Sequence, residues 1–412
     1  MKRRDFLIGC SAGAALMATS RWRLLAGTPW MPSAALPAKD HTLIVLFLRG
    51  GADGLQLVAP ISDRHYQDAR PEGLKVREGE GLDLGEYQGT GFAWHPQARD
   101  LKDLFDQKQL AIVHACGLVN GTRSHFDAQD LIERGINRNS GEYDGWMARY
   151  LRQVQTNGQL PAVSASGEMA RAFEGFGNAA AISSLAEYRL RKVIRAPRFV
   201  EALYANDSLM GPAASQTMQT VRYLENALTE REREALEEVG AGYPRHWPAE
   251  ELSRNLQTVA QLIKMNAGAH VVNVDYGGWD THERQPYIFG QLVKGLSQSL
   301  AAFYRDMEPY RNKITVVVMS EFGRRLRANR SRGTDHGHGN LMLVLGGKVK
   351  GGRHYGQWPG LAPDALDKGV DLAVTTDYRN VLANVLRGPL GHQNTGQVFP
   401  GFTGYRSMGL FA

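Results

Sequence analysis

Short apolar runs alternate with amphipathic stretches along most of this sequence. Strands are predicted at 43–48, 110–115, 271–274, 314–320 and 341–347, where the apolar residues follow one another with few polar interruptions. Helices are predicted at 95–107, after residue 125 and at 287–307, because apolar residues recur there every three to four positions. Strands that alternate with helices predict an α/β fold, with a largely parallel sheet sandwiched between helices.

Longer helical patterns dominate the interval 143–265, as at 215–239 and 249–265. Polar loops with Gly and Pro separate these patterns. We interpret the interval as a helical insertion in a single domain that spans residues 39–412. No internal repeat interrupts this organisation.

The first 38 residues resemble a twin-arginine signal peptide. Arg3 and Arg4 precede Phe6 and Leu7, and an apolar run extends to about residue 18. That run is too short for a permanent transmembrane helix. We therefore expect export to the periplasm or beyond by the twin-arginine translocase, with cleavage near residues 35–38. A lipid anchor at Cys10 is disfavoured because only three apolar residues precede it, and a basic amphipathic helix is the alternative interpretation.

Removal of residues 1–38 would change the charge of the chain markedly. The net charge of +6 falls to +2, because five basic residues and one acidic residue lie in that segment. The remaining charge gives no support for a nucleic-acid partner. Cys116 is then the one cysteine left, so no internal disulfide is expected.

Acids and histidines follow the ends of several predicted strands, and side chains at the carboxyl ends of parallel strands meet at one edge of the sheet. Carboxylates and imidazoles together suit a divalent ion such as Zn or Mn, and two ions about 4 Å apart could clamp a phosphoryl displacement. The candidates are Asp53, Ser124, His125, Asp280, His282, Glu321, Asp335, His336 and His338. Four of them have an ordinary alternative: Asp53 could end a turn, Ser124 or Asp280 could cap a helix, and Glu321 could pair with Arg324 or Arg325.

Five segments of the chain resemble the bacterial family called domain of unknown function 1501: FLRGGADG, TRSHFDAQ, GGWDTH, MSEFGR and TDHGHGN. That family is in turn similar to the alkaline phosphatase-like superfamily of sulfatases and phosphatases. The resemblance implies a mixed, largely parallel sheet and a metal site. It implies metal ligands at Asp53, Asp280, His282, Glu321 and His338, and a nucleophile in the region of Ser124.

One position departs from the superfamily pattern. Phe322 stands where a histidine ligand would follow Glu321, and a phenyl ring cannot bind a metal. Asp335 and His336 have the missing Asp-His pairing but come later in the chain. We therefore expect one or two divalent ions, and a site without any metal ion is the alternative.

Two functions are compatible with these residues. The first is an exported metal-dependent hydrolase of phosphate or sulfate esters. In it Ser124 would attack, His125, Asp335 and His336 would transfer protons or support the ligands, and Arg49 and Arg123 would hold the substrate anion. The second is a non-catalytic exported protein that retains the fold. Its cleft would bind an anionic small molecule, an envelope polymer or a protein partner.

Overall fold

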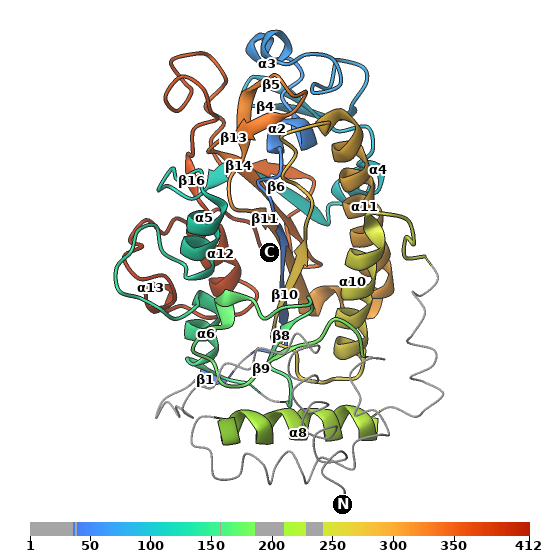
Figure 1. Ribbon diagram of the computed structural model, residues 1–412, viewed down its shortest axis with the longest axis vertical. Coiled ribbons are helices and arrows are strands. Elements are labelled where there is room, and N and C mark those ends of the chain that lie inside the picture. The colour runs from blue at the N-terminus through green and yellow to red at the C-terminus, as the bar shows by residue number, and fades with distance from the viewer. Residues whose placement is uncertain (1–35, 38, 157, 186–209, 228–241) are drawn as a thin grey trace, which may run out of the picture.

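A computed structural model describes residues 36–37, 39–156, 158–185, 210–227 and 242–412 (Figure 1). The expected twin-arginine signal and Cys10 lie outside these residues, as does part of the helical pattern at 215–239. Within the described ranges, no helix is both long and apolar enough to cross a membrane.

A nine-stranded sheet forms the centre of the described chain, in the order β15-β6-β14-β11-β2-β10-β8-β9 with β16 beside β6. Its strands are β2 (Thr42–Leu48), β6 (Leu110–Gly117), β8 (Ala162–Ser164), β9 (Ala179–Ala181), β10 (Val271–Tyr276), β11 (Ile314–Ser320), β14 (Asn340–Leu345), β15 (Arg353–Tyr355) and β16 (Thr376–Asp377). All pairings are parallel except those of β14, which runs antiparallel to both β11 and β6. The predicted largely parallel sheet is confirmed.

Helices cover both faces of this sheet (Figure 1). One face carries α5 (His125–Glu133), α6 (Trp146–Leu151), α12 (Tyr378–Arg387) and α13 (Thr395–Val398), and the other carries α4 (Arg99–Asp106), α10 (Ala249–Lys264) and α11 (Gln285–Asp306). The central strands are apolar at successive positions because their side chains enter two cores alternately. In β2, for example, Leu43 and Val45 pack under α5 and α12, whereas Ile44 and Leu46 pack under α10 and α11.

Smaller elements complete the described chain. Two short sheets pair β3 (Val58–Ala59), β5 (Thr90–Trp94) and β4 (Leu82–Tyr87), and β12 (Arg324–Ala328) with β13 (Thr334–His336). The strand β1 (Leu36–Pro37) pairs with β7 (Val154–Gln155). The remaining helical elements are α2 (Gly54–Leu57), α3 (Arg64–Ala69), α8 (Met210–Ala227), η1 (Arg171–Phe173) and η2 (Glu308–Lys313).

The interval 143–265 is more closely integrated than a helical insertion. It does contain α6, α8 and α10, but β8 and β9 within it extend the main sheet in parallel beyond β10. These strands have three residues each, too short for their apolar pattern to stand out from the neighbouring loops. The expected insertion is therefore corrected to a segment that supplies one end of the sheet and helices of both layers.

The direction of β14 decides which loops meet. The strands β2, β6, β10 and β11 all end at one edge of the sheet, and the antiparallel β14 begins there. The stretch GTDHGHGN, which precedes β14, is thereby brought to the same edge as the loops that follow the other strands.

Candidate metal centre

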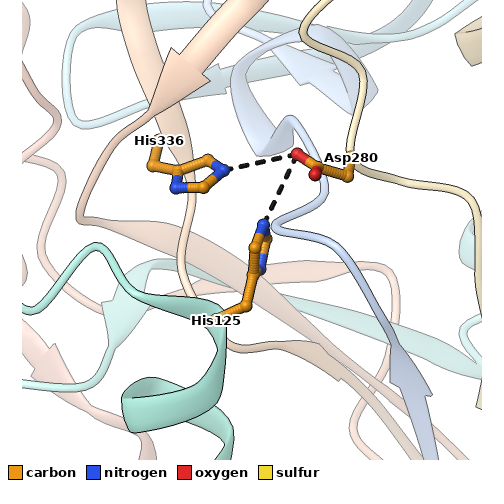
Figure 2. A group of neighbouring side chains, drawn as sticks. All are labelled: His125, Asp280 and His336. Carbon is orange, nitrogen blue, oxygen red and sulfur yellow. Dashed lines mark hydrogen bonds and ion pairs between the residues drawn. The ribbon is translucent and has the colours of Figure 1, made fainter.

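Four side chains from distant parts of the sequence converge at this edge. His125 is the first residue of α5, Asp280 and His282 follow β10, and His336 ends β13. The Nε2 atoms of His282, His336 and His125 lie 3.1, 3.3 and 3.4 Å from Oδ1 of Asp280. Figure 2 shows the rings of His125 and His336 directed at this carboxylate. We call these four residues the His-Asp cluster.

The other ring nitrogen of each histidine is held by an oxygen acceptor. Nδ1 of His125 lies 2.8 Å from Oε1 of Glu321, and Nδ1 of His336 lies 2.7 Å from the carbonyl oxygen of Arg123. Nδ1 of His282 lies 3.3 Å from Oδ1 of Asp335.

Ionised carboxylates and carbonyl groups only accept hydrogen bonds, so each Nδ1 must be the donor. In a neutral imidazole this leaves the lone pair on Nε2, which faces the cluster.

This arrangement fits a divalent cation. The Nε2 atoms of His282 and His336 are 2.7 Å apart, and two lone pairs at that distance repel unless a proton or a metal ion lies between them. Among the described residues, the buried Nε2 of His125 has no hydrogen-bond partner. His125, Asp280 and His336 place their donor atoms within 4.8 Å of one another. Imidazole nitrogens with a carboxylate oxygen are ligands for Zn and Mn.

The electrostatics favour charged carboxylates around a neutral His336. Burial alone would raise the pKa of Asp280, but the hydrogen bond and charge of Arg324 lower it to about 2. Burial is likewise outweighed at Glu321, where hydrogen bonds from His125 and Gln129 lower the pKa to about 2. The hydrogen bond to Glu321 raises the pKa of His125, whereas burial lowers that of His336.

Glu321 lies behind His125, outside the group of converging donor atoms. Its side chain is fully buried, and Oε1 accepts hydrogen bonds from His125, from Nε2 of Gln129 at 2.8 Å and from the backbone N–H of Gly50 at 2.9 Å. Oε2 lies 2.9 Å from the hydroxyl of Ser320. The direct metal ligation expected for Glu321 would require these contacts to break. The alternative pairing of Glu321 with Arg324 or Arg325 is also not observed.

Arg324 is a functional residue that the sequence did not reveal. Its guanidinium is buried and donates to Oδ1 of Asp280 at 2.6 Å and to the carbonyl oxygens of Gly50 and Gly51 at 2.6 Å. The backbones of Gly50 and Asp280 also lie in direct contact. Glycine permits this contact, because the φ of Gly50 is +118° and a Cβ there would lie 2.4 Å from the backbone nitrogen of Asp280. An arginine two positions after a phenylalanine carries no signal in the sequence that it will be buried beneath the His-Asp cluster.

Two expected ligands lie in other interactions. Asp53 is fully buried, accepts from Arg70 at 2.6 Å and from Gln285 at 2.6 Å, and caps α2. His338 lies with Nδ1 3.0 Å from Asp367 and Nε2 2.9 Å from the carbonyl oxygen of Leu118. The structure brings neither residue into the His-Asp cluster.

The expected anion-binding arginines already have acidic partners. Arg49 pairs with Glu133 at 2.5 Å and Asp275 at 2.9 Å, and Arg123 pairs with Asp371. Arg123 nevertheless touches the site through its carbonyl oxygen, which holds His336.

Ser124 and Phe322 flank the cluster. Ser124 is the N-cap of α5, where its hydroxyl accepts a hydrogen bond from the backbone N–H of Asp127 at 3.3 Å. The ring of Phe322 is buried, with its centroid 4.8 Å from that of His125 and 4.9 Å from that of His336. Phe322 thus packs the apolar side of the two imidazoles.

The sequence at residues 121–398 matches the family described as "Protein of unknown function (DUF1501)", and because this match spans more than half of the chain, the chain belongs to that family. No curated protein matches the sequence.

Solved structures with a similar arrangement include Ps i-CgsB, with 9% identity, coverage of 88% of this chain and 74% of the other, and a TM-score of 0.42. A protein in the alkaline phosphatase superfamily from Vibrio parahaemolyticus has 12% identity, coverage of 86% and 71%, and a TM-score of 0.35. The C-terminal periplasmic domain of EcEptC from Escherichia coli, in complex with Zn, has 9% identity, coverage of 77% of each chain and a TM-score of 0.32.

Proposed function

We propose that this DUF1501 protein is an exported, metal-dependent hydrolase of phosphate or sulfate esters. The observation that supports this most directly is the convergence of three imidazole Nε2 atoms on one carboxylate oxygen, with each Nδ1 engaged by an acceptor. Such prior orientation of imidazoles, with an acceptor at the second ring nitrogen, is typical of metal ligands.

The ligands would be His125, His282, His336 and Asp280. A divalent ion held there would act as a Lewis acid on an ester oxygen. One carboxylate and three imidazoles suit a single Zn or Mn ion. Arg324 fixes Asp280 from the buried side, and Glu321 and Asp335 fix two of the imidazoles.

Ser124 is the candidate nucleophile. It precedes His125 directly and lies at the N-terminus of α5, where the helix dipole favours an anionic group. In the described part of the chain, its hydroxyl accepts the hydrogen bond from Asp127 but donates none, so its proton is available to a base. Asp335, which has a half-exposed side chain next to His282, is the candidate base for that proton.

Export and substrate follow from other features. The twin-arginine pattern at residues 1–38 supports passage through the twin-arginine translocase to the periplasm or beyond. The substrate would be an anionic small molecule or an envelope polymer, because the cluster holds cationic and metal-ligating groups at a partly exposed edge of the sheet.

Metal content and turnover test the proposal together. Residues 39–412, purified from the exported protein without chelators, should contain near-stoichiometric Zn or Mn and hydrolyse members of a panel of phosphate and sulfate esters. His282→Ala should lose both properties. The matched control is His65→Ala, because His65 lies at the start of α3, outside the cluster. Full metal content in His282→Ala would contradict the assignment.

A second function is favoured by one observation. Arg324 already places a positive charge 2.6 Å from Asp280, so the cluster can be held together without an ion. In that case the protein would be a non-catalytic exported protein that binds its ligand at the same edge. Absence of metal from the purified protein, with none taken up on titration, would favour this function.

A further inference from the structure

A concentration of positive charge lies beside the His-Asp cluster. The hairpin formed by β12 and β13 carries Arg325, Arg327, Arg330 and Arg332, and Arg284 lies in the adjoining loop. We call these five residues the basic hairpin. Residues 281–285 and 324–336 together contain six arginines and two carboxylates, a net charge of +4, whereas residues 39–412 as a whole carry +2. The charge is therefore local.

The turn of the hairpin is fixed to the loop that carries two of the cluster residues. Nδ2 of Asn329 donates to the carbonyl oxygen of His282 at 2.9 Å and to Oδ1 of Asp335 at 3.0 Å. A Cβ on Gly333 would lie 2.2 Å from the carbonyl oxygen of His282, so the two backbones are in direct contact. The backbone N–H of Gln285 donates to the carbonyl oxygen of Arg332 at 3.1 Å. The basic hairpin is thus held at a constant position relative to His282.

These arginines are available to a ligand. Within the described ranges, Arg284, Arg327, Arg330 and Arg332 are exposed and have no carboxylate within ion-pair distance, and Arg325 is 4.0 Å from Asp371. Neighbouring unpaired charges of one sign repel each other, so the basic hairpin destabilises the protein when no anion is bound.

Two of the arginines also occupy unfavourable backbone conformations. Arg284 has φ +53° and Arg332 has φ +58°, the left-handed region in which a residue with a Cβ is less stable than glycine. Glycine would relieve both positions. The presence of a long cationic side chain at each suggests a use for that side chain.

We infer that the basic hairpin binds further sulfate or phosphate groups of a polyanionic chain whose reacting ester lies at the His-Asp cluster. This inference rests on the proposed function for the reacting group, but the hairpin itself is argued from charge and geometry. The bound polymer is an anionic glycan or envelope polymer. A nucleic-acid partner is disfavoured because the positive surface is one hairpin, and residues 39–412 carry a net charge of only +2, whereas nucleic-acid-binding domains carry broad basic faces.

Binding of defined polyanions tests the inference. The probes are a fluorescent heparin oligosaccharide for sulfate groups and inorganic polyphosphate for phosphate groups, each titrated with residues 39–412 at several salt concentrations. Arg330→Gln combined with Arg332→Gln should weaken binding about tenfold at low salt. It should also reduce the slope of log Kd against log salt by about 1.5, because roughly one counterion is released for each cationic contact.

A control variant that removes the same number of charges distinguishes binding at the hairpin from binding through the overall charge of the protein. Arg138→Gln combined with Arg353→Gln removes two exposed arginines away from the cluster, since Arg138 follows α5 at the end opposite His125 and Arg353 pairs with the first residues of β6. This double variant should bind within twofold of the parent. If the hairpin variant is unfolded by circular dichroism, Arg327→Glu on β12 replaces it.

The outcomes separate the two proposals. Selective weakening in the hairpin variant, with either probe, supports the inference, and the tighter probe identifies sulfate or phosphate. Equal loss in both double variants overturns it, as does equal or tighter binding of single-stranded DNA. Ester turnover without polyanion binding rejects the hairpin inference alone. Selective polyanion binding by a protein without metal or turnover supports the inference and rejects the hydrolase alone.

Discussion

Replacing Glu321 by glutamine would test whether this residue controls the metal affinity of the cluster without touching the ion. Glutamine has nearly the same shape and can keep the hydrogen bonds that Glu321 makes. The amide oxygen would accept from His125 and Gln129, and the amide group would donate to the hydroxyl of Ser320, which can turn to the carbonyl oxygen of Leu48 at 2.7 Å. The fold should therefore survive, and the main loss is one negative charge behind His125.

The size of the effect follows from the bond between His125 and Glu321. At 2.8 Å and with a fully buried carboxylate, this is a charge-assisted hydrogen bond. Such bonds contribute about 1.5–3 kcal/mol, against about 0.5–1.5 kcal/mol for neutral ones. The change should therefore weaken metal binding by about 1–2 kcal/mol, because His125 would be less firmly oriented and less basic. The metal dissociation constant should rise about 5- to 30-fold, which overlaps the range of about 10–100-fold found for residues that orient metal ligands.

Competition against a chromophoric chelator measures this directly, with Zn and with Mn. Asp335→Asn is the graded comparison, because the bond from His282 to Asp335 is longer, at 3.3 Å, and its carboxylate is half-exposed. It should raise the dissociation constant about threefold, since exposed charge-assisted bonds contribute less. A dissociation constant for Glu321→Gln within twofold of the parent, with thermal unfolding unchanged, would refute the orienting role of Glu321.

Other predictions concern stability and the approach of the loops. Arg70→Ala should lower the free energy of unfolding by about 3–5 kcal/mol in urea titrations, because it leaves the fully buried carboxylate of Asp53 without its charge partner; no loss would contradict this pairing. Gly50→Ala should weaken metal binding and lower the melting temperature together, because the added Cβ meets the backbone nitrogen of Asp280, and an effect on neither would contradict the close approach. Burial lowers the pKa of His41 to about 3, so the unfolded chain takes up a proton there first as the pH falls. The stability due to neutral His41 should be complete above about pH 6.5 and decline towards pH 3. The difference in unfolding free energy between the parent and His41→Asn should therefore shrink in acid; a constant difference would exclude this contribution.

The strands were predictable because they are buried on both faces. The strand β2 is apolar at every position from Leu43 to Leu48, and this pattern is visible without knowledge of its neighbours. The convergence of the strand ends followed from the parallel sheet. The sequence could not show that β14 runs antiparallel to its neighbours. Because of that direction, the stretch before β14, which contains His336, lies at the same edge as the loops that follow the parallel strands.

The roles of the polar residues were less predictable, since they depend on partners that are distant in sequence. His282 and His336 were expected at one site and their Nε2 atoms lie 2.7 Å apart, whereas Asp53, an expected metal ligand, is paired with Arg70. Glu321 was expected to bind the ion and instead lies behind His125. A carboxylate that binds a metal ion and a carboxylate that orients a metal-binding histidine have the same sequence signature, and only their tertiary contacts distinguish them.

These placements limit the number of ions that the site can hold. A second ion would need additional carboxylates, but Asp53 is neutralised by Arg70 and Glu321 is occupied by four donors. Phe322 fills the space against the imidazoles with an apolar ring. With neutral imidazoles, the negative charges of Asp280, Glu321 and Asp335 balance those of Arg324 and a single divalent ion, so the loaded site would be close to neutral. The positive field at this edge of the sheet therefore comes from the unpaired arginines of the basic hairpin, and it favours an anionic ligand that extends beyond the cluster.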